Sequence, residues 1–378
     1  MPARGLWVAS LNDHKVTFSC PVRALFTLIL TICGFWAVEF AIFHTGAYFT
    51  ILRHDSSTGA VETHVHNELG RARHSLRQVL TIGDSRMGFL PRYANEMRQD
   101  TGYEYASIAL GGATPRDWYY MLRGADPDAN RYSAIVIAME DYDDTETIED
   151  YSVRAADLYY VIGRLKYSDL PEFARSFHDP ELQWAAVRGI VLKGLIYKRD
   201  FQDFLLHPQE RLDLAKLAHK DSYLWYYNYV GPNQSLEGVV VDFNNRTVTV
   251  PAGFSEAQKA AYRARFLDPR PPEKGVHSAF LHQWLGKIYE HYRGSKTRLV
   301  FLHLPRGPFI RPDQPPLNAH SSVRELGQQP GVILMPEHIF DSIERPGLFL
   351  DQMHMNGPGC AEFSRILARE VSHALDAF

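Results

Sequence analysis

Two short motifs at opposite ends of the chain contain the residue types of a serine nucleophile and its base. Ser85 follows the apolar stretch 79–82, and Asp351 and His354 lie three residues apart near the C-terminus. A serine hydroxyl is a weak nucleophile until an adjacent base takes its proton, and a carboxylate orients that base. Together the motifs predict acyl chemistry at Ser85, although each alone would also suit a helix cap and a surface histidine.

Apolar runs separated by helical stretches predict the elements that position these residues. Strands are expected at 79–82, 103–110, 133–139, 298–304 and 331–335. Helical stretches at 91–101 and 115–123 separate the first three, and a final helix follows Gly357. Such alternation is typical of parallel strands joined by crossover helices, so the predicted fold class is α/β. Ligands bind at the carboxyl ends of strands in open α/β sheets, which is where Ser85 lies.

The middle of the chain departs from this pattern. Residues 146–294 are mostly helical in their periodicity, with a hairpin signal at 244–245. We therefore expect one α/β domain, formed by residues 76–145 and 295–378, with a large helical insertion. A separate second domain is the alternative.

The N-terminal segment 22–43 is apolar apart from Arg23 at its start and Glu39 near its end, and it is long enough to cross a bilayer. Basic residues are confined to its N-terminal side, and none follows until Arg53. This asymmetry predicts that residues 1–21 stay in the cytoplasm and that the rest is translocated, with 44–75 as a juxtamembrane stalk. A cleaved signal peptide and a buried core helix are the alternatives.

The composition narrows the classes of function. The chain has 378 residues, 45% of them hydrophobic and 22% charged, with a net charge of −4. A nucleic-acid-binding protein would normally show a basic face, so no nucleic-acid partner is expected. Its three cysteines give neither a disulfide framework nor a zinc-binding spacing, and we expect no metal or other cofactor.

The serine motif is not the nucleophile elbow of the α/β-hydrolases, because Met87 occupies the place of the last glycine in Gly-x-Ser-x-Gly. It instead resembles the first block of the SGNH (GDSL-like) hydrolase superfamily, in which residues 83–85 are Gly-Asp-Ser. Gly112 is similar to the glycine of the second block, and Asp351-x-x-His354 to the last block.

This resemblance implies a flavodoxin-like three-layer α/β/α sandwich with a Ser85–His354–Asp351 catalytic triad. It further implies an oxyanion hole that includes the backbone N–H groups of Ser85 and Gly112. The resemblance covers roughly residues 76–145 and 295–378.

The third block departs from the family. The family has Gly-x-Asn after the third strand, whereas residues 138–141 here are Ala-Met-Glu-Asp. An ionised Glu140 would repel an oxyanion, so either Glu140 points away, or another donor such as Arg86 or Arg116 takes over, or the catalysis is weak. Both arginines would also suit solvated helix starts or ion pairs with neighbouring aspartates. Asp84, Arg86, Arg116, Glu140 and Arg306 are the candidate contacts for a substrate or an oxyanion.

The whole layout resembles membrane-anchored SGNH-like proteins that modify bacterial envelope polysaccharides, and Asn356 and Gly359 extend the fit of the last motif. This resemblance implies an esterase or O-acyltransferase that acts on the acyl groups, O-acetyl groups above all, of an envelope or secreted polysaccharide. The chain would be single-pass in the inner membrane with its catalytic domain on the periplasmic side, and a multi-spanning membrane acyltransferase is the partner that the resemblance suggests. The alternative is a non-catalytic glycan-binding or scaffolding module.

Overall fold

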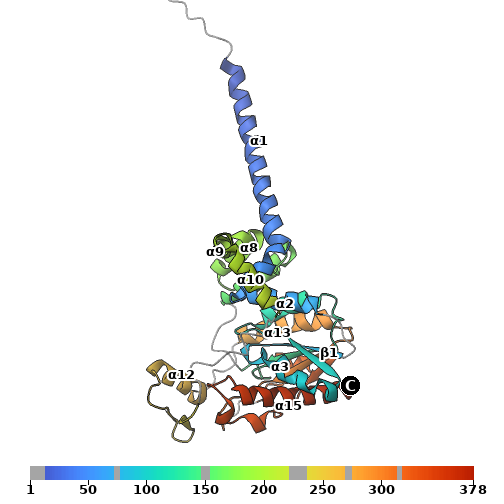
Figure 1. Ribbon diagram of the computed structural model, residues 1–378, viewed down its shortest axis with the longest axis vertical. Helices are drawn as coiled ribbons and strands as arrows, with labels where there is room; N and C mark the ends of the chain where they lie inside the picture. The colour runs from blue at the N-terminus through green and yellow to red at the C-terminus, as the bar shows by residue number, and fades with distance from the viewer. Residues whose placement is uncertain (1–12, 72–76, 146–153, 221–235, 269–274, 313–316) are drawn as a thin grey trace, which may run out of the picture.

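The computed structural model describes residues 13–71, 77–145, 154–220, 236–268, 275–312 and 317–378. A long helix, α1 (Asp13–Glu39), projects from the folded remainder, which we call the head (Figure 1). A π-helical turn, η1 (Phe40–His44), continues α1. The stretch Val22–His44 is long and apolar enough to cross a membrane. Side chains from 22 to 38 are all exposed, so α1 is not a core helix of the head.

The head is built on a five-stranded sheet in the order β2-β1-β3-β6-β7, and all neighbouring strands are parallel. The strands are β1 (Arg77–Ile82), β2 (Tyr103–Ser107), β3 (Ala134–Met139), β6 (Arg298–His303) and β7 (Val332–Leu334). The expected α/β class is therefore confirmed. Every residue of β3 is buried, which explains why a strand covered on both faces is a continuous apolar run.

Helices cover both faces of the sheet (Figure 1). On one face, Leu80 and Ile135 belong to a core shared with α2 (Ser57–Gly70), α5 (Pro115–Ala125) and α13 (Gly275–Tyr292). On the other face, Val79 and Val136 share a core with α3 (Leu90–Ala94) and α15 (Gly357–Asp376). The two cores fix the sheet between its helices and leave the carboxyl ends of the strands at one edge.

The remaining elements are short or lie in the middle of the chain. The middle contains α6 (Ala156–Val161), η6 (Tyr167–Asp169), α7 (Leu170–Arg175), α8 (Pro180–Val191), α9 (Lys193–Leu206), α10 (Pro208–Lys220), the antiparallel pair β4 (Val240–Asp242) and β5 (Thr247–Thr249), and α12 (Glu256–Leu267). The short elements elsewhere are η2 (Ala47–Ile51), η3 (Ser85–Met87), η4 (Asn95–Met97), α4 (Arg98–Thr101), α14 (Ser322–Leu326), η7 (Asp341–Ile343) and η8 (Pro346–Leu348).

Two segments differ from the layout expected from the sequence. Helix α13 lies within the expected insertion 146–294, yet its Trp284 is fully buried in a core of the sheet. The segment 44–75 was expected to be a stalk, but its described part contains η2 and α2, and Val61 of α2 is fully buried. An amphipathic helix that packs on a sheet has the same periodicity as one that packs elsewhere, so the sequence does not show its partner.

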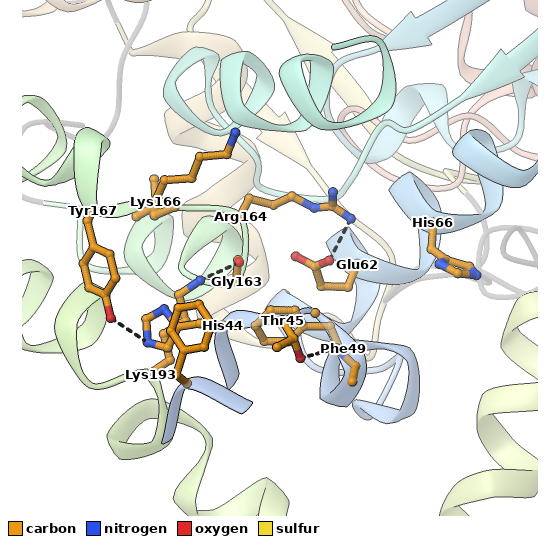
Figure 2. A pocket seen from close by; sticks show the side chains of 14 residues that line it. His44, Thr45, Phe49, Glu62, His66, Gly163, Arg164, Lys166, Tyr167 and Lys193 are labelled. Carbon is orange, nitrogen blue, oxygen red and sulfur yellow. Dashed lines mark hydrogen bonds and ion pairs between the residues drawn. The ribbon is translucent and has the colours of Figure 1, made fainter. Parts of the chain in front are cut away.

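The last turn of α1 is part of the head. Glu39 is buried, and its Oε1 accepts a hydrogen bond of 2.8 Å from the backbone N–H of Gly194 in the first turn of α9. A carboxylate is favourable at this position because free N–H groups and the positive end of the helix dipole meet there. Beyond Glu39, His44 lies 3.4 Å from the hydroxyl of Tyr167 at the edge of a cavity (Figure 2). The exposed apolar part of α1 thus ends before Glu39.

Candidate active site

The structure brings Ser85, His354 and Asp351 together. The Ser85 hydroxyl lies 2.8 Å from Nε2 of His354, and Nδ1 of the same ring lies 2.9 Å from Oδ2 of Asp351. Asp351 is buried, whereas Ser85 and His354 are partly exposed. Burial alone would raise the pKa of Asp351, but hydrogen bonds from the His354 ring and from two backbone N–H groups outweigh it and leave the pKa lowered. An ionised Asp351 suits a ring that must become imidazolium.

A tight turn after β1 positions Ser85. A Cβ on Gly83 would lie 2.9 Å from the Cβ of Ala138 in β3, so only glycine fits there without displacement. Leu110 N–H donates to the Gly83 carbonyl at 3.2 Å, which ties this turn to the segment after β2. Asp84 then caps η3 by accepting a hydrogen bond of 2.8 Å from the N–H of Arg86. Ser85 is the first residue of that turn.

The loop before α15 places His354. Asp351 Oδ1 accepts hydrogen bonds from the backbone N–H groups of Met353 and His354, so one carboxylate shapes the loop and orients the ring. Asn356 caps α15 by accepting from the N–H of Gly359 at 3.0 Å. A Cβ on Gly359 would lie 2.1 Å from the carbonyl oxygen of Leu348. Each named residue of the motif Asp-x-x-His-x-Asn-x-x-Gly therefore has a structural role in this loop or at the start of α15.

A cavity of about 260 Å³ opens beside the serine. Its wall includes Ser85, Gly112, Trp118, Arg154 and Met353. Gly112 has a φ of +76°, a conformation that favours glycine. Within the described ranges, the backbone N–H groups of Ser85 and Gly112 have no acceptor. Both are therefore available to a ligand in this cavity.

Arg154 lies against the Gly112 turn. Its Nη2 is 3.1 Å from the position that a Cβ on Gly112 would take. Buried Asp157 anchors this arrangement, because it lies 3.5 Å from Nε of Arg154 and accepts a hydrogen bond of 2.7 Å from the hydroxyl of Thr114, which caps α5. Tyr160, also on α6, donates to the carbonyl of Gly111 at 2.5 Å. Helix α6 thus supports the turn that contains Gly112 and places a cation beside it.

Glu140 lines the cavity but is covered by two arginines. Its Oε2 lies 3.1 Å from Nη2 of Arg86, and its Oε1 lies 2.5 Å from Nη2 of Arg265 on α12. Arg86 is buried and also pairs with Asp84 at 2.6 Å. Both oxygens of the Glu140 carboxylate are therefore opposed by positive charge. Arg86 is engaged by two carboxylates, which identifies it as a positioning residue.

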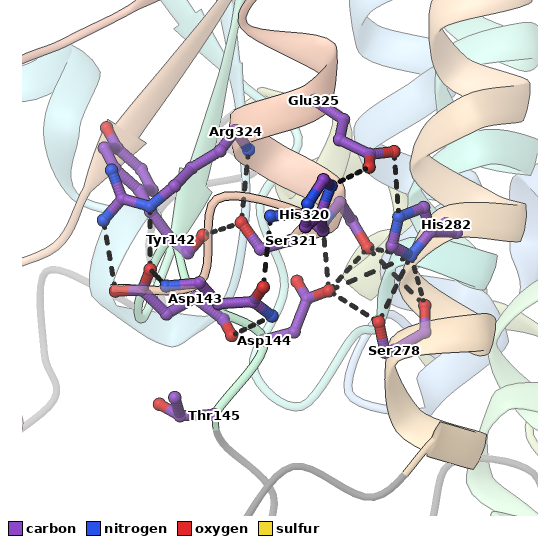
Figure 3. A network of polar contacts seen from close by, with 12 residues as sticks. Tyr142, Asp143, Asp144, Thr145, Ser278, His282, His320, Ser321, Arg324 and Glu325 are labelled. Atoms are coloured by element: carbon purple, nitrogen blue, oxygen red, sulfur yellow. Dashed lines mark hydrogen bonds and ion pairs between the residues drawn. The ribbon is translucent and has the colours of Figure 1, made fainter. Parts of the chain in front are cut away.

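A network of polar contacts fixes the segment that follows Glu140 (Figure 3). Asp144 adopts a φ of +56°, unusual for a residue with a side chain, and lines the cavity. Its Oδ2 accepts hydrogen bonds of 2.9 Å from the hydroxyl of Ser278 and from both the N–H and the hydroxyl of Ser322. Burial raises the pKa of Asp144, against these hydrogen bonds. The network holds this wall of the cavity against α13 and α14.

Two of the candidate contact residues lie away from the cavity. Arg116 is fully buried, pairs with Asp157 at 2.8 Å and stacks over the ring of Phe177. Arg306 pairs with Glu344 and Asp341. Neither lines the cavity beside Ser85. The structure therefore places neither arginine beside Ser85, and both take part in ion pairs elsewhere in the head.

Sequence reasoning missed Arg154 and Arg265. Both come from the middle of the chain, which the resemblance does not cover, and each meets its partner only through the fold. Nothing in the spacing of either residue relative to Ser85 indicates its place. For Arg154 the sequence does offer one signal. Asp157 follows it by three residues in a segment expected to be helical, and oppositely charged residues at that spacing are neighbours on a helix.

The comparisons with known proteins add no relative. Neither the protein-family models nor the curated proteins with which the chain was compared match it. Across the described residues, no group of three or more His, Cys, Asp or Glu side chains is arranged to hold a metal ion. The site must therefore be interpreted from its own geometry.

Proposed function

We propose that this chain is a serine-dependent acyl esterase or O-acyltransferase. The observation that carries the proposal is the 2.8 Å contact between the Ser85 hydroxyl and Nε2 of His354, with Asp351 on the opposite ring nitrogen. A nucleophile and base within hydrogen-bond reach, with a third group that orients the base, are what covalent acyl transfer requires. Support also comes from the strand order, which is that of flavodoxin-like sheets, where ligands bind at the carboxyl ends of strands.

In this mechanism the Ser85 oxygen attacks the carbonyl carbon of an ester, and its proton passes to Nε2 of His354. The carbonyl oxygen becomes an oxyanion, which the N–H groups of Ser85 and Gly112 hold. Collapse of the intermediate expels the alcohol, which takes the proton from His354 and leaves Ser85 acylated. Water or a sugar hydroxyl then loses its proton to His354 and attacks the acyl group. Collapse of this second intermediate releases the free acid or the new ester, and His354 returns the proton to the Ser85 oxygen.

Arg154 supplies the donor that the family asparagine would otherwise provide. Its guanidinium lies against the Gly112 turn in the wall of the same cavity. A fixed cation beside a developing oxyanion stabilises the transition state more than the neutral ester, which is the requirement for catalysis. Glu140 does not oppose this role strongly, because Arg86 and Arg265 neutralise its carboxylate.

We further propose membership of the SGNH superfamily and a polysaccharide as the acyl acceptor or substrate, most simply through O-acetyl groups. The apolar helix α1 supports a single-pass anchor, which we place in the inner membrane. The basic residues before it favour a head on the periplasmic side. A multi-spanning acyltransferase is the class of partner that would supply acyl groups there. The competing function is a non-catalytic glycan-binding or scaffolding module, which Glu140 at the asparagine position favours.

The test is turnover of an activated acetyl ester by the full-length chain in detergent. Ser85→Ala should reduce turnover to the background rate, while Ser168→Ala, which removes an exposed hydroxyl outside the cavity, should leave it unchanged. Equal turnover by the wild type and Ser85→Ala would exclude Ser85 as the nucleophile. Binding of an acetylated polysaccharide without any turnover would favour the non-catalytic function.

A further inference from the structure

A second cavity lies where α1 meets the head (Figure 2). Its volume is about 720 Å³, and none of its lining residues lines the cavity beside Ser85. The wall comes from the end of the apolar segment, from α2, from the residues after α6 and from the start of α9. It includes Phe40, His44, Glu62, Arg164, Lys166 and Lys193.

Lys193 is the buried cation of this cavity. Its side chain is 3% exposed, and its ammonium donates a hydrogen bond of 2.8 Å to the carbonyl of Gly163 and lies 5.4 Å from the ring centre of Phe49. An ammonium has three N–H donors, and a charge taken out of water is costly unless it is paired and hydrogen-bonded. Burial lowers the pKa of Lys193 to about 8, although the charge of Glu62 opposes this. A bound anion would remove that cost.

The other charges in the wall leave an excess of positive charge. Arg164 pairs with Glu62, whose Oε2 lies 2.7 Å from Nη2. The charges of Arg164 and Glu62 cancel, and the two further cations, Lys166 and Lys193, give the wall its net positive charge. Glu39 lies outside the wall, and its Oε1 already accepts the N–H of Gly194. Lysine and arginine together are typical binders of phosphate.

The position of the cavity indicates where the anion comes from. Phe40 and His44 belong both to the wall and to the candidate membrane span, so the cavity lies at the end of that span. Leu195, two residues after Lys193, is 57% exposed, as expected for a side chain at a bilayer surface. Basic pockets at the ends of transmembrane helices can hold the phosphate of an anionic lipid head group, as they do on the cytoplasmic side of membranes. We propose that the cavity at the foot of α1 binds a phosphate group, presented by an anionic lipid headgroup, through Lys193 and Arg164.

Native mass spectrometry of the full-length chain in detergent tests this site. The probes are phosphatidylglycerol and phosphatidylcholine of matched acyl chains, each titrated separately. We expect one phosphatidylglycerol to be retained at least tenfold more tightly than phosphatidylcholine. Lys193→Met should abolish this preference, while Lys198→Met, which removes an exposed lysine of the same helix outside the cavity, should keep it.

The same experiment distinguishes the sources of phosphate. Inorganic phosphate that binds at micromolar concentration and displaces the lipid would support the phosphate site but overturn the lipid as its source. No preference between the two lipids in the wild type would overturn the proposal, and this result does not depend on whether Lys193→Met folds. Equal preference in the wild type and a folded Lys193→Met variant would also overturn it. None of these outcomes depends on the activity of Ser85.

Discussion

The guanidinium of Arg86 pairs with the carboxylate of Glu140, with Nη2 3.1 Å from Oε2. Residue 140 is where the sequence departs from the SGNH pattern, which has an asparagine there. The ion pair changes what the carboxylate at this position does. An isolated carboxylate there would repel an oxyanion, but a carboxylate between Arg86 and Arg265 forms part of an ion-pair network. The network begins at Asp84, next to the serine, so it also fixes the turn that presents Ser85.

Replacing Arg86 with methionine should destabilise the head. The change leaves the carboxylates of Asp84 and Glu140 without their shared cation, and both are partly buried. We expect the free energy of unfolding to fall by about 1–3 kcal/mol, less than for a fully buried pair because water reaches both carboxylates. Denaturant unfolding measures the loss. Arg265→Met is the matched control, since it removes the second arginine partner of Glu140 and should cost less. A larger loss of stability for Arg265→Met than for Arg86→Met would contradict this expectation.

Asp351→Asn should reduce ester turnover while the loop keeps its shape. The asparagine oxygen still accepts from the N–H groups of Met353 and His354, but its amide nitrogen cannot accept from the His354 ring. The ring is then held in the wrong tautomer. We expect turnover to fall on the order of a thousandfold or more, with little change in the thermal midpoint. Turnover within a few-fold of the wild type would show that Asp351 does not orient the base.

Arg154→Met should reduce turnover without unfolding the chain. Removal of one oxyanion donor typically costs on the order of a hundredfold to a thousandfold, and Arg154 is partly exposed, so the substitution leaves no large buried void. The loss should appear in kcat, with KM for a small ester nearly unchanged. Arg175→Met, an exposed arginine outside the cavity, is the control. A change confined to KM would instead assign Arg154 to substrate binding.

The buried Lys193 should make stability depend on pH in the alkaline range. Its pKa falls from 10.5 to about 8 in the folded chain, chiefly through burial. Between these values the unfolded chain binds a proton that the folded chain has released, so the free energy of unfolding rises with pH. The wild type should gain stability relative to Lys193→Met from pH 8 towards 10.5, on the order of 2–3 kcal/mol in total. Unfolding in lipid-free nonionic detergent measures the difference, and parallel curves for the two proteins would contradict it.

Much of the sheet could be predicted from the sequence, and the reason is burial. The expected strands 79–82, 133–139 and 298–304 correspond to β1, β3 and β6, which lie in the middle of the sheet. Strands covered on both faces are apolar throughout and are easily recognised. The edge strand β2 ends at Ser107, earlier than the expected 110, because the apolar residues beyond it continue into the buried approach to the Gly112 turn.

The surroundings of the serine could not be predicted in the same way. The contacts of Glu140 with Arg86 and Arg265 join residues that are far apart in the chain, and a pattern along the sequence does not report such pairs. Glu39 illustrates the same limit. It appears as a charge inside an apolar segment, but the fold places it at the start of α9, where a carboxylate is favourable.

The most direct test of the account is to find the acyl-enzyme. The full-length chain is mixed with an activated acetyl ester, quenched in acid during turnover and digested for peptide mass spectrometry. The proposed mechanism predicts an acetyl group on Ser85 that forms at the rate of alcohol release and is absent from a His354→Ala variant. Alcohol release at the wild-type rate with no acetyl group on Ser85, or with the acetyl group on another residue, would contradict it.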